Sequence, residues 1–437
     1  MSTLDTEEAV TRAFVIHPIL PDWKQANRTP EHRLDEAVGL ARALDLDIVV
    51  SAAELVRQPR PATLFGTGKL DDLKAVVAEN EVDLVIIDGT LTPVQQRNLE
   101  KAMNAKVLDR TGLILEIFGE RAGTAEGVLQ VEHAHLSYQK SRLVRSWTHL
   151  ERQRGGLGFV GGPGETQIEA DRRMIDERLV RIERKLEKVV RTRTLHRQKR
   201  KKAPLPVVAL VGYTNAGKST LFNRMTGSAV MAKDMLFATL DPTMRSIELP
   251  NGREAIFSDT VGFISDLPTQ LIAAFRATLE EVLEADLILH VRDVSSDETE
   301  AQAEDVVSVL RDLGVEESTL DGAIEVYNKV DLLDGAGRQA WENEAARREG
   351  VICVSALSGH GVEDLLALVA ETLAAAETLV RVDLPASDGA ALAWLHDAAD
   401  VRDTAAEGAT MSLTVSISDT DAQRFARRFG YDFLPAD

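Results

Sequence analysis

The sequence predicts an α/β protein in four parts: a small α/β domain, an antiparallel helical hairpin, a larger domain with a mostly parallel sheet covered by helices on both faces, and a small α+β domain. Three observations lead to this prediction. Short apolar runs alternate with amphipathic stretches in two separate regions, which is the βαβ pattern of parallel sheets. Between those regions, two heptad stripes flank a glycine-rich segment. At 437 residues the chain is also too long for one hydrophobic core.

Composition is that of an ordinary globular protein, with 44% apolar and 27% charged residues. The chain does not open with a basic segment followed by an apolar one, so we expect no secretory signal. Apolar runs are shorter than the roughly 18 residues of a membrane helix, so we expect no membrane insertion. The single cysteine, Cys353, excludes an internal disulfide framework and fits a reducing compartment, which favours the cytoplasm.

The net charge of −20 argues against a nucleic-acid partner, because phosphate binding needs a basic surface. This net charge is unevenly distributed along the chain. Residues 141–202 hold 18 Lys and Arg against 8 Asp and Glu, an excess of 10 positive charges. The sequence therefore predicts one basic arm attached to an acidic body.

Residues 1–118 are expected to form the first α/β domain. Buried strands are predicted at residues 13–16, 48–51, 84–87 and 106–108. Apolar residues at helical spacing predict helices near residues 34–44 and 70–78. Residues 65–69, Phe-Gly-Thr-Gly-Lys, have two interpretations: a simple tight turn, which we favour, or a second phosphate-binding turn.

Residues 119–203 are expected to form the helical hairpin. The first stripe repeats every seven residues at Leu129, Leu136, Leu143 and Leu150. The second alternates spacings of four and three at Ile175, Leu179, Ile182, Leu186 and Val189. Each narrow stripe needs a partner to bury against, so the two helices should pack together. The connector, residues 155–164, contains six glycines, whose conformational entropy an ordered role must offset.

Residues 204–377 are expected to form the larger domain, which opens with a strand at residues 207–211. A GxxxxGKS motif follows this strand directly. The residues assigned to phosphate binding are Gly212, Tyr213, Thr214, Asn215, Ala216, Gly217, Lys218, Ser219 and Thr220. Glycines let backbone N–H groups approach phosphates, Lys218 reaches the β and γ phosphates, and Ser219 supplies a Mg²⁺ ligand.

A second motif follows a predicted strand at residues 255–258, itself preceded by an Asn251-Gly252 hairpin turn. It consists of Asp259, Thr260, Val261 and Gly262. An aspartate at the end of a strand holds Mg²⁺, and the Gly262 N–H can bond the γ phosphate.

Two further motifs predict a guanine pocket. The strand at residues 324–327 is followed by Asn328, Lys329, Val330 and Asp331, and the one at 351–354 by Ser355, Ala356 and Leu357. Asp331 can accept N1–H and the 2-amino hydrogens of guanine, a pair that adenine lacks. Because open α/β sheets bind ligands at the carboxyl ends of strands, the four motifs should form one site.

These motifs resemble those of translation-factor-type GTPases, and the resemblance implies a P-loop GTPase domain with guanine specificity from Asn328 and Asp331. A further segment, Phe237, Ala238, Thr239, Leu240 and Asp241, resembles the first switch of the Obg-like branch. It implies that Thr239 ligates Mg²⁺ when the γ phosphate is present, with Thr243 as the competing candidate. We therefore expect GTP and Mg²⁺ as ligands, Ser219 and Thr239 as metal ligands, and Lys218, Thr239 and Gly262 as catalytic residues.

One position departs from this pattern. Many GTPases place a water-orienting glutamine after the DxxG glycine, but this chain has Phe263, which cannot hydrogen-bond water. Intrinsic hydrolysis should therefore be slow. Asn215 resembles the asparagine that helps hold K⁺ in potassium-stimulated relatives, and the alternative is that it only caps the loop.

The glycine-rich connector, its continuation through residues 165–173 and the two switch segments together closely resemble the HflX family of ribosome-associated GTPases. The resemblance covers residues 12–380. It implies binding to the large ribosomal subunit and the splitting of stalled or idle ribosomes under stress. An alternative is a regulatory GTPase that acts on another RNA or a protein through the hairpin.

The basic residues of the second helix lie largely off its apolar stripe and can face a phosphate backbone. They are Arg172, Arg173, Arg178, Arg181, Arg184, Lys185, Lys188, Arg191 and Arg193. The alternative is a solvated helix partly neutralised by Glu177–Arg181 and Glu187–Arg191 pairs.

Residues 378–437 predict a small α+β domain, with strands near 379–382 and 412–417 and helices at 392–398 and from 421. His133, His135 and His196 lack metal-ligand spacing, so we expect no zinc site. We expect a monomer.

Overall fold

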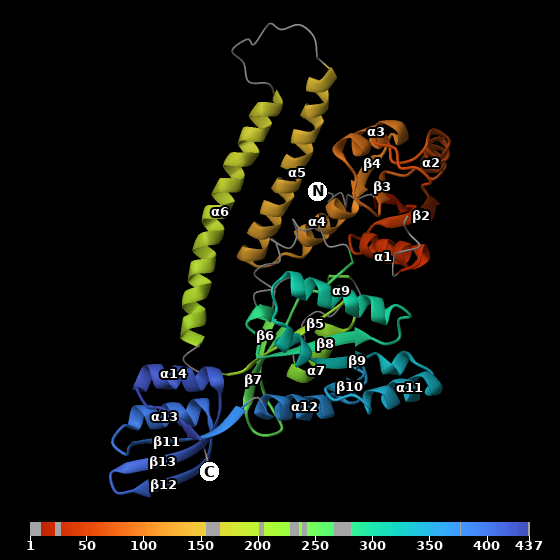
Figure 1. Ribbon diagram of the computed structural model, residues 1–437. Coiled ribbons are helices and arrows are strands. Elements are labelled where there is room, and N and C mark those ends of the chain that lie inside the picture. The colour runs from red at the N-terminus through yellow and green to blue at the C-terminus, as the bar shows by residue number, and fades with distance from the viewer. Residues whose placement is uncertain are drawn as a thin grey trace, which may run out of the picture.

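The computed structural model describes residues 10–21, 28–153, 167–200, 205–227, 236–237, 243–265, 281–375 and 377–435. The described residues form three β-sheets with their helices, together with one long helical hairpin (Figure 1). The predicted α/β fold and its order of parts are confirmed. The glycine-rich connector at residues 155–164 lies outside the described residues.

The first part is a 4-stranded parallel sheet with strand order β2-β1-β3-β4. Its elements are β1 (Arg12–Ile19), α1 (Pro30–Arg42), β2 (Asp47–Leu55), α2 (Thr67–Glu79), β3 (Leu84–Ile87), α3 (Pro93–Met103), β4 (Lys106–Asp109) and α4 (Arg110–Arg121). Successive residues of a strand face opposite sides of a sheet. Accordingly Phe14 and Ile16 pack with α2 and α3, whereas Ala13 and Val15 pack with α1 and α4.

Hydrogen bonds from side chains fix where these helices begin. Thr92 and Gln95 form a capping box at the first turn of α3. The Asp109 carboxylate accepts from the Gly112 N–H at 2.9 Å and caps α4. Because Asp109 both ends β4 and caps α4, the two elements meet without a loop, and Arg110 is held at the carboxyl edge of the sheet.

The hairpin consists of α5 (Ala125–Gln153) and α6 (Gln167–Arg200), which run antiparallel (Figure 1). Leu136, Leu179 and Ile182 are buried in the seam between the helices. Partly buried residues on either side extend that seam, namely Leu129, Ile175 and Leu186. Two ion pairs of 2.5 Å cross it, Lys140–Asp176 and Arg178–Glu132. The predicted stripes are confirmed for these residues, while the side chain of Leu150 lies outside the described part.

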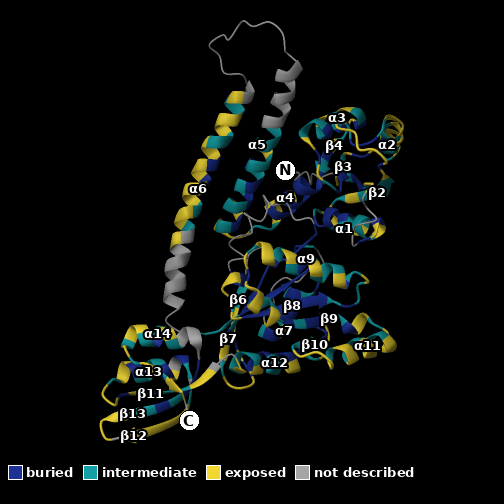
Figure 2. Ribbon diagram, viewed as in Figure 1, coloured by how far each residue is buried: buried dark blue, intermediate teal, exposed yellow. Residues whose placement is uncertain are grey.

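The second sheet has six strands in the order β10-β9-β8-β5-β7-β6, in which only β6 is antiparallel. Its strands are β5 (Val207–Gly212), β6 (Thr243–Glu248), β7 (Glu254–Asp259), β8 (Leu287–Asp293), β9 (Ile324–Asn328) and β10 (Val351–Cys353). Its helices are α7 (Lys218–Thr226), α9 (Thr299–Asp312), α10 (Glu317–Asp321), η2 (Val330–Leu332), α11 (Gly335–Ala345) and α12 (Val362–Ala375). Apolar residues of α7 and α12 cover one face and those of α9 cover the other, so β5 and β8 are the most enclosed strands (Figure 2).

The last part is an antiparallel sheet with strand order β12-β13-β11-β14 and two helices. Its elements are β11 (Glu377–Pro385), α13 (Gly389–Ala398), β12 (Asp400–Glu407), β13 (Thr410–Ser418), α14 (Asp419–Phe429) and β14 (Leu434–Pro435). Phe425 is fully buried at its centre, with ring contacts to Trp394, Phe429 and Phe433. The predicted β11, β13, α13 and α14 are confirmed, whereas β12 and β14 were not predicted.

One hydrophobic cluster joins the first and second sheets. It contains Leu113 and Phe118 of α4 together with Val211, Val261 and Phe263 from the larger domain. Side chains from both domains thus share one buried core. Within the part of the chain that the structure describes, no helix is both long and apolar enough to traverse a bilayer.

Candidate functional site

The phosphate loop depends on glycine at two positions. Gly212 and Gly217 have φ values of +152° and +90°, which disfavour any other residue. A Cβ atom at Gly212 would collide with the Val291 carbonyl, and one at Gly217 with the side-chain amide of Asn328. The loop therefore passes β8 and Asn328 too closely to carry side chains at these positions.

Lys218, the first residue of α7, is buried at 6% exposure. Its ammonium group donates to the carbonyl oxygens of Gly212 at 3.1 Å and Tyr213 at 2.7 Å. Burial, with a smaller effect of Lys329, lowers its pKa to about 8, although Asp259 opposes the shift. The lysine is thus directed into the loop, where it can exchange these carbonyls for phosphate oxygens.

Ser219 and Asp259 form one oxygen-rich corner beside this lysine. The Ser219 hydroxyl donates to the Asp259 carboxylate at 2.7 Å, and Asp259 is fully buried at the end of β7. A Cβ at Gly262 would lie 3.0 Å from Lys218 Nζ and 2.9 Å from the Thr214 Cα. Hard oxygen atoms are the ligands that Mg²⁺ prefers, so this donor set fits that ion.

Asn328 links the phosphate loop to the segment after β10. Its Nδ2 donates to the Ala216 carbonyl at 2.8 Å, and its Oδ1 accepts from the Ala356 N–H at 3.0 Å. Ser355 is fully buried and Asp331 is exposed on η2, so its carboxylate is accessible to a ligand. Three of the predicted motifs therefore meet around Asn328.

The DxxG segment continues against the phosphate loop. Phe263 is buried at 3% exposure; its N–H donates to the Gly212 carbonyl at 3.1 Å, and its carbonyl accepts from the Thr214 N–H at 2.7 Å. Asn215 is exposed and adopts a left-handed conformation with φ +59°. The Phe263 ring thus belongs to the core shared by the two domains rather than to a solvent-facing position.

The first-switch residues are described only in part. Phe237 is buried, and its ring lies edge-on to that of Phe118, with the centroids 4.8 Å apart. Thr243 opens β6 and pairs with Asp259 in the sheet register. Ala238, Thr239, Leu240 and Asp241 lie outside the described residues, so their assignments stay predictions.

Comparison with known proteins agrees with this geometry. Four family models match in order along the chain: GTP-binding GTPase N-terminal (residues 31–119), GTP-binding GTPase Middle Region (121–200), 50S ribosome-binding GTPase (207–329) and HflX C-terminal domain (340–436). GTPase HflX of Magnetococcus marinus is 51% identical over 91% of this chain and 90% of its own. GTPase HflX of Escherichia coli is 41% identical over 97% of both chains.

The chain belongs to the HflX family of GTPases. The sequence-based prediction of this family is thereby confirmed, and so is that of GTP hydrolysis as its activity.

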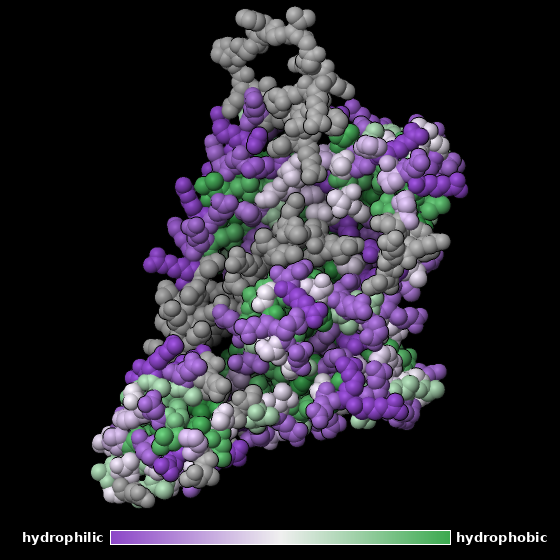
Figure 3. Space-filling view, viewed as in Figure 1, coloured by the Kyte–Doolittle hydropathy of each residue, from purple (hydrophilic) through white to green (hydrophobic). Residues whose placement is uncertain are grey.

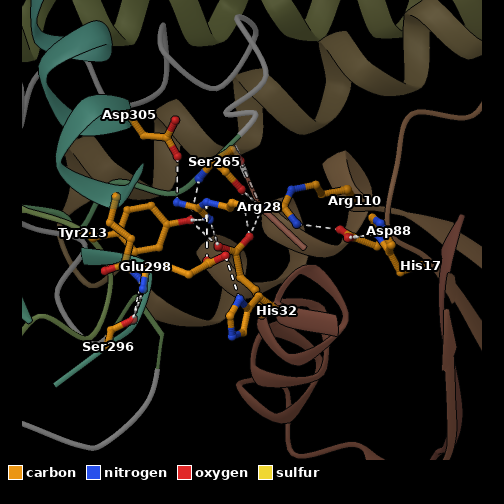
Figure 4. Close-up of polar contacts among 12 residues, drawn as sticks. His17, Arg28, His32, Asp88, Arg110, Tyr213, Ser265, Ser296, Glu298 and Asp305 are labelled. Atoms are coloured by element: carbon orange, nitrogen blue, oxygen red, sulfur yellow. Dashed lines mark hydrogen bonds and ion pairs between the residues drawn. The ribbon is translucent and has the colours of Figure 1, made fainter. Parts of the chain in front are cut away.

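The residues that surround the HflX-family nucleotide site include several that the sequence motifs did not indicate. Arg28 and Glu36 of the first domain contact the Tyr213 hydroxyl, and Arg110 contacts Ser265 beyond the DxxG segment (Figure 4). No local pattern marks these side chains, because their partners lie 155 to 185 positions away in the sequence.

Four residues that the sequence analysis considered outside the nucleotide motifs make contacts within the fold: Lys69, His133, His135 and Cys353. Of residues 65–69, which were expected to form a tight turn, Thr67 to Lys69 belong to the first turn of α2, and Lys69 pairs with Glu54 at 2.8 Å, so its ammonium group is already held by a carboxylate. His133 pairs with Glu183 at 3.3 Å and His135 with Glu116 at 3.8 Å. Cys353 lies in a buried cluster with Tyr327 and Val330, and burial raises its pKa to about 11.

Proposed function

We propose that this GTPase binds GTP with Mg²⁺ at the site described above and, in the GTP form, binds the large ribosomal subunit through its hairpin. Splitting stalled or idle ribosomes under stress, as a monomer in the cytoplasm, is the activity that we assign to this binding. The observation that carries the proposal is the exposed basic surface of α6. A match to a 50S ribosome-binding GTPase model over residues 207–329 supports it.

That surface consists of side chains opposite the buried seam. Among the side chains of α6 that the structure describes, which do not include Arg193, the exposed basic residues are Arg172, Arg173, Arg178, Arg181, Arg184, Lys185, Lys188 and Arg191. Leu179 and Ile182 face α5 instead, so the helix separates an apolar stripe from a cationic one. Hydrophilic residues accordingly line the outer edge of the hairpin (Figure 3). A cationic stripe on a rigid, projecting helix fits an RNA backbone.

Ion pairs with acidic side chains temper this surface without cancelling it. Arg178 pairs with Glu132 of α5 at 2.5 Å, and Arg173 approaches Glu177 at 3.9 Å. Exposed ion pairs of this kind contribute little and exchange readily for phosphate contacts. Arg181 and Arg184, one and nearly two turns beyond Arg178, are therefore the strongest single candidates for RNA contact.

At the nucleotide site we assign Lys218 to the β and γ phosphates, Ser219 and Thr239 to Mg²⁺, and the Gly262 N–H to the γ phosphate. Asp259 lies beside Ser219 at 2.7 Å and orients it. Bound Mg²⁺ would neutralise charge on the transferring phosphoryl group. Base recognition is assigned to Asn328 and Asp331, with Ser355, Ala356 and Leu357 closing the pocket.

Hydrolysis should be slow until the partner binds, because the buried Phe263 offers no hydrogen bond to the attacking water. We assign K⁺ binding to the exposed Asn215. The ribosome would then act on a site that binds GTP well but turns it over poorly.

Binding to purified large subunits, with a non-hydrolysable GTP analogue or with GDP, tests the proposal. Arg178→Glu, Arg181→Glu and Arg184→Glu together should abolish binding. The matched control replaces three exposed arginines away from the hairpin, Arg57, Arg311 and Arg347, with Glu. Both triple variants change the net charge equally, so a general electrostatic effect would weaken them alike.

The expected result is loss of binding in the hairpin variant and retention in the control. Equal loss in both, or none in either, would refute the hairpin as the binding surface and favour the regulatory alternative. Sedimentation of intact ribosomes after incubation with GTP then tests splitting separately from binding.

A further inference from the structure

Three segments that surround the nucleotide contact the first α/β domain. Tyr213 belongs to the phosphate loop, Ser265 follows the DxxG segment, and Phe237 opens the first switch. Tyr213 bonds Arg28 and Glu36, Ser265 bonds Arg110, and Phe237 packs on Phe118 of α4. Among the described residues, the first domain thus touches the phosphate loop, the segment after the DxxG motif and the start of the first-switch segment.

The Tyr213 hydroxyl uses its full hydrogen-bonding capacity in this interface. It donates to the Glu36 carboxylate and accepts from Arg28 at 2.7 Å and from the Ser265 N–H at 2.9 Å. Tyr213 is buried at 5% exposure, so solvent cannot replace these partners without domain movement. The hydroxyl therefore ties the phosphate loop to the segment beyond Gly262 and both to the first domain.

Glu36 is the residue on which these bonds converge. Its carboxylate accepts from Arg28 at 2.9 Å and from the Ser265 hydroxyl at 3.0 Å, as well as from Tyr213 and Arg110. We call Arg28, Glu36, Arg110, Tyr213 and Ser265 the Glu36 network; Figure 4 labels its members Arg28, Arg110, Tyr213 and Ser265. Removing Glu36 would leave two buried guanidinium groups without their shared carboxylate.

Arg110 extends the network toward the hairpin. It donates to the Ser265 carbonyl at 3.0 Å and to the Ser265 hydroxyl at 3.1 Å. Its neighbour Asp109 is fully buried and accepts from Tyr138 and from Arg142, both at 2.5 Å and both on α5. Two adjacent residues thus bond the segment beyond Gly262 on one side and the hairpin on the other.

We propose that Glu36 is a positioning residue that couples nucleotide state at the DxxG segment to the orientation of α5, through Arg110 and Asp109. Phosphate contact by Gly262 displaces the segment that ends at Ser265, and the Glu36 network transmits that displacement. The inference deepens the proposed function. It rests on that function only for the identity of the partner that binds the hairpin. The coupling is reciprocal: a partner that binds the hairpin must alter nucleotide affinity by the same factor by which the nucleotide alters affinity for that partner.

A distance measurement within the protein tests the coupling without ribosomes. Spin labels are placed at two exposed positions by Val128→Cys on α5 and Arg347→Cys in the larger domain, since Cys353 is buried. In the otherwise unchanged protein, the distance distribution should differ between a GTP analogue and GDP. In Glu36→Gln that difference should disappear while both nucleotides still bind.

Two milder variants guard against a folding defect in Glu36→Gln. Tyr213→Phe removes one hydroxyl, and Ser265→Ala removes another, so each should reduce the distance change in part. The matched control is Glu317→Gln, which breaks the surface pair with Arg311 at 2.7 Å and should leave the change intact. Circular dichroism melting identifies any variant that is simply unfolded.

The outcomes separate this inference from the proposed function. A nucleotide-dependent distance that survives in Glu36→Gln, Tyr213→Phe and Ser265→Ala overturns the coupling, as does the absence of any change in the parent protein. Large-subunit binding is measured in parallel, where Glu36→Gln should lower the preference for the GTP analogue over GDP by roughly tenfold, a typical size for coupling between two sites. A distance change without nucleotide-dependent subunit binding would refute the ribosomal partner and leave the coupling standing.

Discussion

Replacing Gly217 with alanine should weaken GTP binding through Asn328. Gly217 has φ +90°, and an added Cβ would collide with the Asn328 side-chain amide. That amide donates to Ala216 at 2.8 Å, and the same side chain accepts from Ala356 at 3.0 Å. The added methyl group must therefore displace the residue that joins the phosphate loop to the base pocket.

The magnitude follows from two separable terms. Backbone strain at a left-handed position costs about 1–2 kcal/mol in the free energy of unfolding. Loss of the two Asn328 hydrogen bonds, at about 0.5–1.5 kcal/mol each, adds about 1–3 kcal/mol to the cost of forming the nucleotide pocket. That second term corresponds to roughly 5- to 150-fold weaker GTP binding.

Gly227→Ala is the matched control, because Gly227 ends the same helix with φ +63° and a Cβ there would meet no atom within 4 Å. Gly227→Ala should therefore show the cost of backbone strain without the loss of the Asn328 hydrogen bonds. Affinity for a fluorescent GTP analogue and chemical denaturation are measured for both variants. Equal GTP affinity in the two variants would refute the argument that Asn328 is displaced.

Three further predictions concern the same domain. Asp331→Asn should shift preference from guanine toward xanthine nucleotides, and a competition assay that finds unchanged GTP preference would contradict base recognition by Asp331. His290 has its pKa lowered to about 4, chiefly by burial, so the unfolded chain binds more protons between pH 6.5 and 4 and stability should fall as pH drops through that window. His290→Asn should lose part of this acid sensitivity in denaturation at pH 7 and pH 5; identical pH dependence in both proteins would exclude His290. Replacing K⁺ with Na⁺ should slow GTP turnover if Asn215 binds the cation, and equal rates would leave it only its capping role.

Sequence patterns predicted the elements whose signal is local. The apolar run of β5, the heptad residues Leu136 and Leu179, and the motifs around Lys218 and Asn328 all lie within short windows. Helix α4 escaped prediction because α1, α5 and the larger domain cover several of its sides, burying Leu113, Ile114, Leu115, Ile117 and Phe118. A helix enclosed in this way exposes only a narrow stripe, here with Glu116 and Glu120, so its 3.6-residue period is weak. Strand β12 was also not predicted, because it lies at the edge of its sheet and its sequence is largely polar.

The Glu36 network was invisible for a different reason. Arg28 donates hydrogen bonds to Asp305, 277 positions away in the sequence, and to Tyr213, 185 positions away. Charged residues at such separations carry no periodic signal. The sequence motif assigns Tyr213 to the loop that follows β5, and the structure shows its backbone there. Its hydroxyl, however, points into an interface that exists only after two domains have folded.

The location of that interface explains why it can govern the nucleotide loops. Open α/β sheets bind their ligands at the carboxyl ends of strands. At that edge of the first sheet, the Asp88 carboxylate contacts Arg110 at 2.5 Å and His17 at 2.8 Å. Arg110 lies at this edge, with Nη1 on Asp88 and Nη2 on Glu36 and Ser265. Buried guanidinium groups are costly when a partner is removed, so these contacts favour the placement of the two domains in which all of them are made. A displacement at Ser265 is then opposed by the whole network, and relaxing it requires the first domain and α5 to move together.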